Sequence, residues 1–235
     1  MGEQKTTASS VNRAKTYQLV LFPLNNGATN VYYVLVLSYI ATFGSKVLAL
    51  SMLFASVMVT GMRLFDAVTD PIIGALMDRT NGRFGKFRPF MVIGNLIMAA
   101  SILVLYCLTP LIPASAMGLR YAAFVALYAV WVIGYTFQTS CTRSGQTVLT
   151  NDPKQRPMFA SFDGVFNTLL FAILGIIIPR IADGYTDVGG YASTQFMHTL
   201  WLMTAIMSAC FTVIAVISIT PKDRPEFFGT GKPVK

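Results

Sequence analysis

The segment from Arg63 to Pro71 places one guanidinium and two carboxylates inside an otherwise apolar run. Asp66 and Asp70 are four residues apart, so on a helix both project from one face, and Arg63 lies on that face. Two carboxylates in a low dielectric stay ionised together only beside positive charge, which Arg63, a bound cation or a proton can supply. Oxygen ligands suit a hard monovalent cation, whereas a soft metal needs thiols or imidazoles. The pattern therefore predicts a cation site, and no metal site beyond a possible Na+.

Two other interpretations of these charges remain open. The first is an internal salt bridge that fastens one helix to another, but each charge inside a membrane costs at least about 2.5–3.5 kcal/mol. The second is an intramembrane aspartyl enzyme, which takes its two acids from different helices. An acid pair on one helix with an arginine beside it suits cation binding better. The sequence also has no nucleophile–base pair, no HExxH and no Walker loop, so we expect no enzyme activity.

These charges lie in a chain with the composition of a membrane protein. Of its 235 residues, 54% are hydrophobic and only 12% are charged, and a spanning helix needs about 20 mostly apolar residues. A soluble enzyme, a disordered chain and a disulfide-rich module are excluded. The sequence predicts an all-α integral membrane protein with six transmembrane helices. We expect them at 17–43, 47–77, 90–110, 119–146, 158–182 and 195–220.

The basic residues predict the orientation of the six helices. If the N-terminus is cytoplasmic, thirteen of the 18 Lys and Arg residues fall on the cytoplasmic side, as the positive-inside rule requires. We therefore expect a cytoplasmic tail over 1–16, a bundle in the cytoplasmic membrane over 17–220, and a second cytoplasmic tail over 221–235. The net charge of +8 then reflects topology, and we expect a lipid bilayer around the chain and no nucleic-acid partner.

Polar side chains form stripes along four of the six spans. A polar stripe inside a membrane must face protein or water, so the first, second, fourth and fifth spans are expected to line an interior. Such side chains either hydrogen-bond a neighbouring helix or meet a polar ligand, and the sequence leaves both open. Asp163 and Asn167 in the fifth span are more typical of wetted interfacial groups. The candidates for ligand contact are Asn25, Asn26 and Asn30 in the first span and Gln138, Thr139 and Arg143 in the fourth.

The stretch RLFDAVTDPIIGALMDRTNGRFGKFRPFMVIG (Arg63–Gly94) resembles the second-to-third helix signature of the glycoside–pentoside–hexuronide:cation symporters. These form the melibiose-permease-like branch of the major facilitator superfamily. Members have twelve spans in two six-helix halves around a central cavity, and this chain is similar to the N-terminal half. The resemblance also implies a gating loop after the second span, formed by Gly74, Asp78, Arg79, Gly82 and Arg83.

The resemblance assigns roles to individual residues. The cation site falls on Asp66, Thr69, Asp70 and Thr136, with Arg63 compensating their charge. The sugar site matches less well, because the family's acids align near Asn25 and on Thr139, its stacking tryptophan on Arg143, and its helix-five arginine near Gly164. Amides and hydroxyls still suit sugar hydroxyls, so we expect a sugar or sugar-like solute. An arginine in the cavity would suit an acidic sugar such as a uronate.

The resemblance therefore predicts symport of a sugar with a coupling cation, which is Na+, Li+ or H+, and no cofactor. A C-terminal half, or a second copy of this chain, would complete the cavity. A different class of interpretation is a truncated or orphan half-transporter that is inactive alone.

Overall fold

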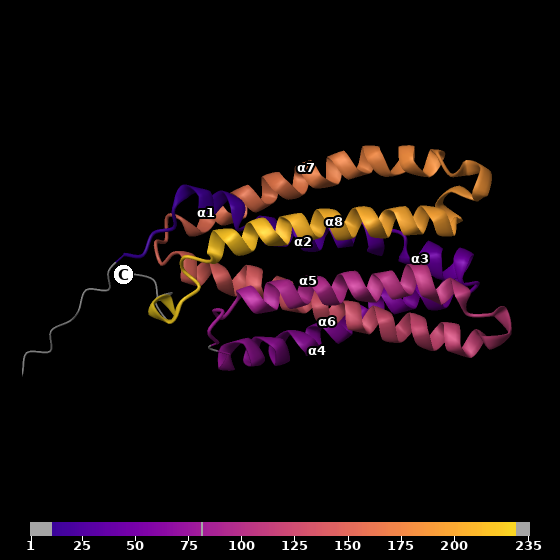
Figure 1. Ribbon diagram of the computed structural model, residues 1–235, viewed down its shortest axis with the longest axis horizontal. Helices are drawn as coiled ribbons and strands as arrows, with labels where there is room; N and C mark the ends of the chain where they lie inside the picture. The colour runs from indigo at the N-terminus through magenta and orange to yellow at the C-terminus, as the bar shows by residue number, and fades with distance from the viewer. Residues whose placement is uncertain (1–10, 81, 229–235) are drawn as a thin grey trace, which may run out of the picture.

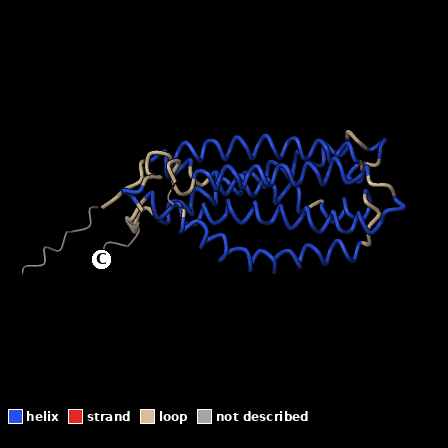
Figure 2. The backbone as a smooth tube through the Cα atoms, turned by 60° about the horizontal axis from the view of Figure 1, so that its bottom comes forward, coloured by secondary structure: helices blue, strands red, loops and turns tan. Residues whose placement is uncertain are grey.

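The computed structural model describes residues 11–80 and 82–228, and in those ranges it contains helices, turns and no β-strand. The long helices lie side by side along one axis, with their connections gathered at the two ends of the bundle (Figures 1 and 2). The helices are α1 (Thr16–Leu21), α2 (Leu24–Tyr32), α3 (Ile40–Thr42), α4 (Met52–Arg79), α5 (Arg88–Leu103), α6 (Met117–Leu149), α7 (Arg156–Asp183) and α8 (Thr194–Ile219).

Five segments of the described chain are long and apolar enough to cross a membrane. They correspond to the predicted second to sixth spans, and all their limits lie within five residues of the predicted ones. The all-α membrane fold is therefore confirmed. These segments are Met52–Arg79, Arg88–Leu111, Ala114–Leu149, Arg156–Asp183 and Thr194–Ile219.

The predicted first span, 17–43, is broken, and the prediction of one continuous helix was wrong. Pro23 separates α1 from α2, since proline lacks the N–H that would continue the ladder. After α2 the chain widens into a π turn at Tyr33–Leu37, and α3 leads into a second one at Phe43–Val47. Short π segments of this kind interrupt helices where neighbouring packing competes with the regular ladder.

The second span begins at Met52 instead of residue 47, because the π turn at Phe43–Val47 still belongs to the first span. The reversal comes after it, where Ala49 has a left-handed φ of 57°. A left-handed residue ends a helix, so α4 restarts only after it, behind Ser51.

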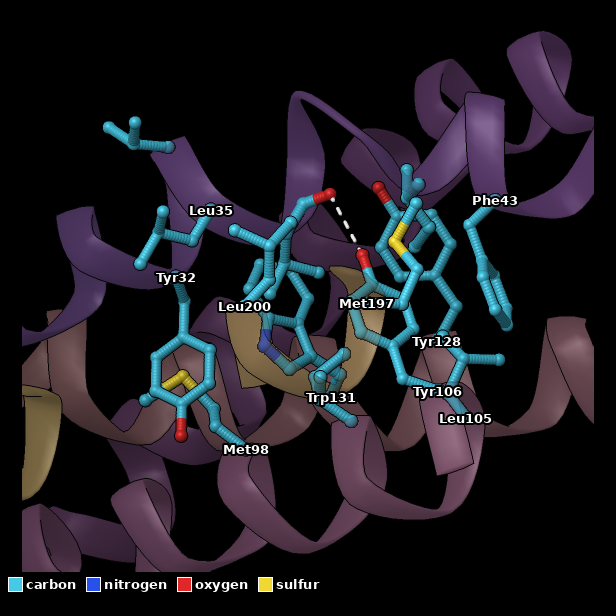
Figure 3. Packing of buried hydrophobic residues seen from close by; sticks show 14 of the residues in the cluster. Tyr32, Leu35, Phe43, Met98, Leu105, Tyr106, Tyr128, Trp131, Met197 and Leu200 are labelled. Atoms are coloured by element: carbon cyan, nitrogen blue, oxygen red, sulfur yellow. Dashed lines mark hydrogen bonds between the residues drawn. The ribbon is translucent and has the colours of Figure 1, made fainter. Parts of the chain in front are cut away.

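Aromatic side chains fill the core between the helices (Figure 3). Tyr32 of α2 packs edge-on against Trp131 of α6, with ring centroids 6.5 Å apart. The Tyr106 hydroxyl donates a hydrogen bond of 3.3 Å to the carbonyl oxygen of Val36, which lies in the first π turn. The core therefore holds the broken first span against α5 and α6.

Glycines bring α5 and α6 into close contact. A Cβ atom on Gly134 would lie 2.8 Å from the carbonyl oxygen of Gly94, and one on Gly94 would lie 2.8 Å from the carbonyl oxygen of Gly134. Small residues permit this approach of two backbones in membrane helices. This contact fixes α6, and with it Thr136 and Arg143.

The segments that flank the bundle pack together at one end of it. Lys222 Nζ donates 2.8 Å to the Leu149 carbonyl and 2.5 Å to Asn12 Oδ1. Arg13 Nε lies 2.8 Å from Asp152 Oδ2. The pKa of Asp152 is held below its usual range by the backbone N–H of Lys154, which donates to the other carboxylate oxygen, and by Arg13. The described parts of both predicted tails therefore belong to the folded bundle.

Replacing Gly134 by Leu is expected to force α5 and α6 apart and to lower the free energy of unfolding by about 1–3 kcal/mol or more, as overpacking does. Gly175→Leu on α7 is the matched control, because a Cβ there meets nothing within 4 Å. The measurement is thermal unfolding of the purified protein in detergent. Equal melting temperatures for the two variants would contradict the proposed contact.

Candidate functional site

The first predicted cation ligand, Asp66, is held by hydroxyl groups from two helices. Thr136 Oγ1 of α6 donates 2.7 Å to Asp66 Oδ1. Thr69 Oγ1 of α4 lies 3.2 Å from Thr136 Oγ1 and donates 3.0 Å to the Asp66 carbonyl oxygen. Thr136 is fully buried and Thr69 is 9% exposed. The structure thus brings three of the four predicted cation-site residues into direct contact across the α4–α6 interface.

The fourth predicted ligand, Asp70, lies one helical turn away and has its own cationic partner. Arg143 Nη1 of α6 is 3.4 Å from Asp70 Oδ2, and the two side chains are 73% and 34% exposed. An exposed pair of this length contributes about 0–1 kcal/mol. The pair links the predicted cation site to a residue of the predicted solute site.

Arg63, predicted to compensate both acids, lies over an aromatic ring and lines the same small cavity as Asp66. Its guanidinium carbon is 5.3 Å from the ring centroid of Tyr33, in the broken first span. The same ring packs edge-on against Phe171 of α7, at 6.4 Å. Among the described residues, the structure shows no ion pair between Arg63 and Asp66. Tyr33 therefore connects the α4 side of the site to the α7 side.

A small cavity adjoins the Asp66 carboxylate. Its volume of about 10 Å³ is close to what one water-sized group occupies. It has polar walls from Asp66 and Arg63, and the remaining walls are half aromatic and half aliphatic. The lining residues are Leu37, Met62, Arg63, Asp66, Tyr128, Trp131, Val132 and Tyr135.

Two of the predicted solute ligands are buried between helices. Asn25 and Gln138 are both fully buried. Asn25 Nδ2 donates 2.8 Å to Thr142 Oγ1 and 2.9 Å to the Gln138 carbonyl. Gln138 Nε2 donates 2.6 Å to Thr212 Oγ1 of α8. In this structure these two amides fasten α2, α6 and α8 together, which is one of the two alternatives that the sequence left open.

The other two predicted amides of the first span pair with α7. Asn26 Nδ2 donates 2.9 Å to each carboxylate oxygen of Asp163. Asn30 Nδ2 donates 2.7 Å to Asn167 Oδ1. All four side chains are partly exposed. Sequence reasoning did not select Asp163 as a site residue, although its spacing to Asn167 repeats the four-residue spacing of Asn26 and Asn30.

The remaining predicted solute ligands lie on α6. The Thr139 hydroxyl is 7% exposed and donates 3.1 Å to the Tyr135 carbonyl of its own helix. Arg143, one turn further on, is the exposed member. The structure therefore leaves three predicted solute ligands accessible, Asn26, Asn30 and Arg143, together with Asp163.

The predicted gating loop is held by residues outside its motif. Asp78 Oδ1 pairs with Lys86 Nζ at 2.7 Å, whereas Arg79, Gly82 and Arg83 are exposed. Gly74, which precedes the loop on α4, is half-buried, and a Cβ there would meet nothing within 4 Å.

Asp223, which follows α8, caps the start of α5. Its carboxylate, 1% exposed, accepts hydrogen bonds from the backbone N–H groups of Lys86, Phe87 and Arg88 at 2.8–3.2 Å. A Cβ on Gly85 would lie 2.2 Å from Asp223 Oδ2, and Gly85 has a φ of +90°. The loop thus requires glycine at position 85. Its backbone N–H groups donate to an acid that lies more than 130 residues away in the sequence.

Residues 22–232 match the family of MFS/sugar transport proteins. The chain therefore belongs to this family, whose members are membrane transporters and not enzymes, and it is an integral membrane protein. The match confirms the resemblance drawn from Arg63–Gly94 and the expectation that the chain is not an enzyme.

Individual relatives agree with this assignment. The chain is 29% identical to the uncharacterized symporter YnaJ of Bacillus subtilis, over 85% of this chain and 42% of the relative. It is 34% identical to the putative glycoside/cation symporter YagG of Escherichia coli, over 80% of this chain and 39% of the relative. It is 28% identical to the glucuronide carrier protein homolog of Escherichia coli, over 70% of this chain and 36% of the relative. The chain thus spans less than half the length of these relatives.

Removing the Asp223 carboxylate is expected to leave buried N–H groups at the start of α5 without acceptors. Asp223→Ala should therefore lower the free energy of unfolding by about 1–3 kcal/mol and increase protease cleavage in the loop before α5. Glu226→Ala, an exposed acid three residues further on, is the control. Thermal unfolding and limited proteolysis measure both effects, and identical behaviour of the two variants would refute the cap.

Proposed function

We propose that this chain supplies the first six spans of a cation-coupled symporter for a sugar or sugar-like solute. The observation that carries the proposal is the contact of Asp66 with Thr136 and Thr69 beside a water-sized cavity. A carboxylate and two hydroxyls offer a set of hard oxygen ligands for a monovalent cation. Asp70, one turn away on the same helix, supplies a second carboxylate when Arg143 releases it.

The proposed mechanism is alternating access. A second six-helix half, or a second copy of this chain, faces the side of α2, α4, α6 and α7 that carries the polar residues, and the two halves rock around the bound solute. Both termini lie in the cytoplasm, and the surrounding membrane is the cytoplasmic membrane. The cation gradient drives transport, and the membrane potential adds about 2.3 kcal/mol per charge for each 100 mV.

The accessible polar side chains on α2 and α7 suit a polyhydroxylated solute. Asn26 and Asp163 together present an amide and a carboxylate, which donate to and accept from sugar hydroxyls. Asn30 and Asn167 extend this pattern one turn further along both helices. We propose these four residues as the sugar-binding side of the site.

An acidic sugar such as a uronate is the second candidate solute. The observation that favours it is Arg143, an exposed guanidinium at the position where the family carries a stacking aromatic residue. A guanidinium binds a carboxylate through two parallel hydrogen bonds. One relative of the chain is named as a glucuronide carrier homolog.

The test of the proposed function is solute uptake into vesicles that contain this chain alone, or this chain with a C-terminal half. A panel of neutral and acidic sugars is supplied with Na+, Li+ or a proton gradient. Asp66→Asn, Asp70→Asn and Thr136→Val are each expected to reduce cation-stimulated uptake to the level measured without the cation. Each change removes an oxygen ligand or a charge at the proposed site.

Asp187→Asn, at an exposed turn between α7 and α8, should leave uptake unchanged. Full cation stimulation in the Asp66 and Asp70 variants would rule out the proposed cation site. Uptake that requires both halves would favour a split transporter, and uptake by this chain alone would favour two copies.

A further inference from the structure

Arg143 is shared between the two sites that the proposed function requires. It belongs to α6, four residues after Thr139 and seven after Thr136, so it lies on the side of α6 that faces α4. Its Nη1 is 3.4 Å from Asp70 Oδ2, while most of its side chain is exposed. The guanidinium therefore contacts a cation-site acid with one nitrogen and keeps other donors free.

The two acids of the proposed cation site have different partners. Asp66 is held by the neutral hydroxyl of Thr136, and among the described residues the structure shows no ion pair for it. Asp70 is paired with a tethered cation, Arg143. Arg63 lies against the Tyr33 ring. A free cation that needs both carboxylates must therefore displace the Arg143 guanidinium from Asp70.

We propose that Arg143 couples solute binding to cation binding by exchanging Asp70 for the carboxylate of an anionic solute. Without solute, the guanidinium occupies Asp70 and opposes cation binding. A solute carboxylate binds the free donors of Arg143 and draws it away, which leaves Asp70 for the cation. This inference rests on the proposed function and specifies its solute as an anionic sugar.

The chemistry of the pair favours this exchange. A single long contact to an exposed carboxylate is weak, so little stabilisation is lost when it breaks. A solute carboxylate can instead bind the planar guanidinium in a bidentate arrangement. The hydroxyls of a neutral sugar carry no charge with which to compete for Arg143. The exchange therefore distinguishes an anionic solute from its neutral analogue.

The exchange also gives a thermodynamic prediction. If the solute raises the affinity for the cation, the cation raises the affinity for the solute by the same factor. Removing the guanidinium should separate the two events, because Asp70 is then available whether or not solute is bound. Cation binding to the variant should be tighter without solute and insensitive to its addition.

The experiment is equilibrium binding of ²²Na+ to the reconstituted chain, together with a C-terminal half where uptake requires one. If the uptake assay identifies the proton as the coupling ion, solute-induced proton binding is measured in place of ²²Na+ binding. The added solutes are methyl glucuronide and methyl glucoside, which differ by one carboxylate. The variants are Arg143→Gln, Arg143→Lys and Arg180→Gln, the last being an exposed arginine near the end of α7.

Methyl glucuronide is expected to raise the cation affinity of the parent protein and of Arg180→Gln by at least about fivefold, the lower end of common couplings. Methyl glucoside should leave it unchanged. Arg143→Gln should bind the cation at least about fivefold more tightly without solute and should not respond to the glucuronide. Arg143→Lys should keep a reduced response, since an ammonium pairs with either carboxylate but lacks the bidentate geometry.

Equal effects of glucuronide and glucoside would overturn the proposal, as would an Arg143→Gln variant with the cation affinity and solute response of the parent. Both results leave the proposed symport intact if the parent protein binds the cation. Absence of cation binding in a correctly inserted parent protein would overturn the symport proposal and this inference together. The two failures are therefore distinguishable.

Discussion

The structure is organised around the neutralisation of charge inside an apolar bundle. Asp66, Asp70 and Arg63 all lie on α4, a helix long and apolar enough to cross a membrane, where an uncompensated charge is expensive. Each has a different partner: Asp66 a hydroxyl of α6, Asp70 a guanidinium of α6, and Arg63 an aromatic ring of the first span. The position of α6 therefore decides the electrostatics of α4, and the glycine contact between α5 and α6 decides the position of α6.

Polar residues on the remaining spans serve two separate purposes. The buried amides of Asn25 and Gln138 connect α2, α6 and α8 at depth, where their N–H groups donate to carbonyl and hydroxyl oxygens in place of water. The accessible amides of Asn26 and Asn30, one and five residues after Asn25, turn toward α7. One short helix thus presents a buried face to α6 and α8 and a partly exposed face to α7, and it carries two of the proposed sugar-binding residues.

The sequence was sufficient to predict the five long spans, and the family resemblance placed Thr136 in the same predicted site as Asp66. Span limits follow from apolar runs, and the Thr136 position followed from the family resemblance. The break in the first span was missed, although Pro23 marks its first part in the sequence, because the hydropathy of 17–43 shows neither the missing proline N–H nor the π turns that follow. The partners of Arg143 and Asn26 were missed for another reason. Spacing along one helix shows which side chains share a face, but the helix opposite that face follows only from the folded structure. Asp163 could have been found by noticing that it and Asn167 repeat the spacing of Asn26 and Asn30.

The capping of α5 by Asp223 has a consequence for how the chain assembles during synthesis. Arg88 and Asp223 are 135 positions apart, so the loop before α5 is translated long before the acid that accepts its N–H groups. Lys222, beside Asp223, likewise reaches back to Asn12 and Leu149. The contacts that Lys222 and Asp223 make with residues 12, 86–88 and 149 can therefore form only after α8 has been translated.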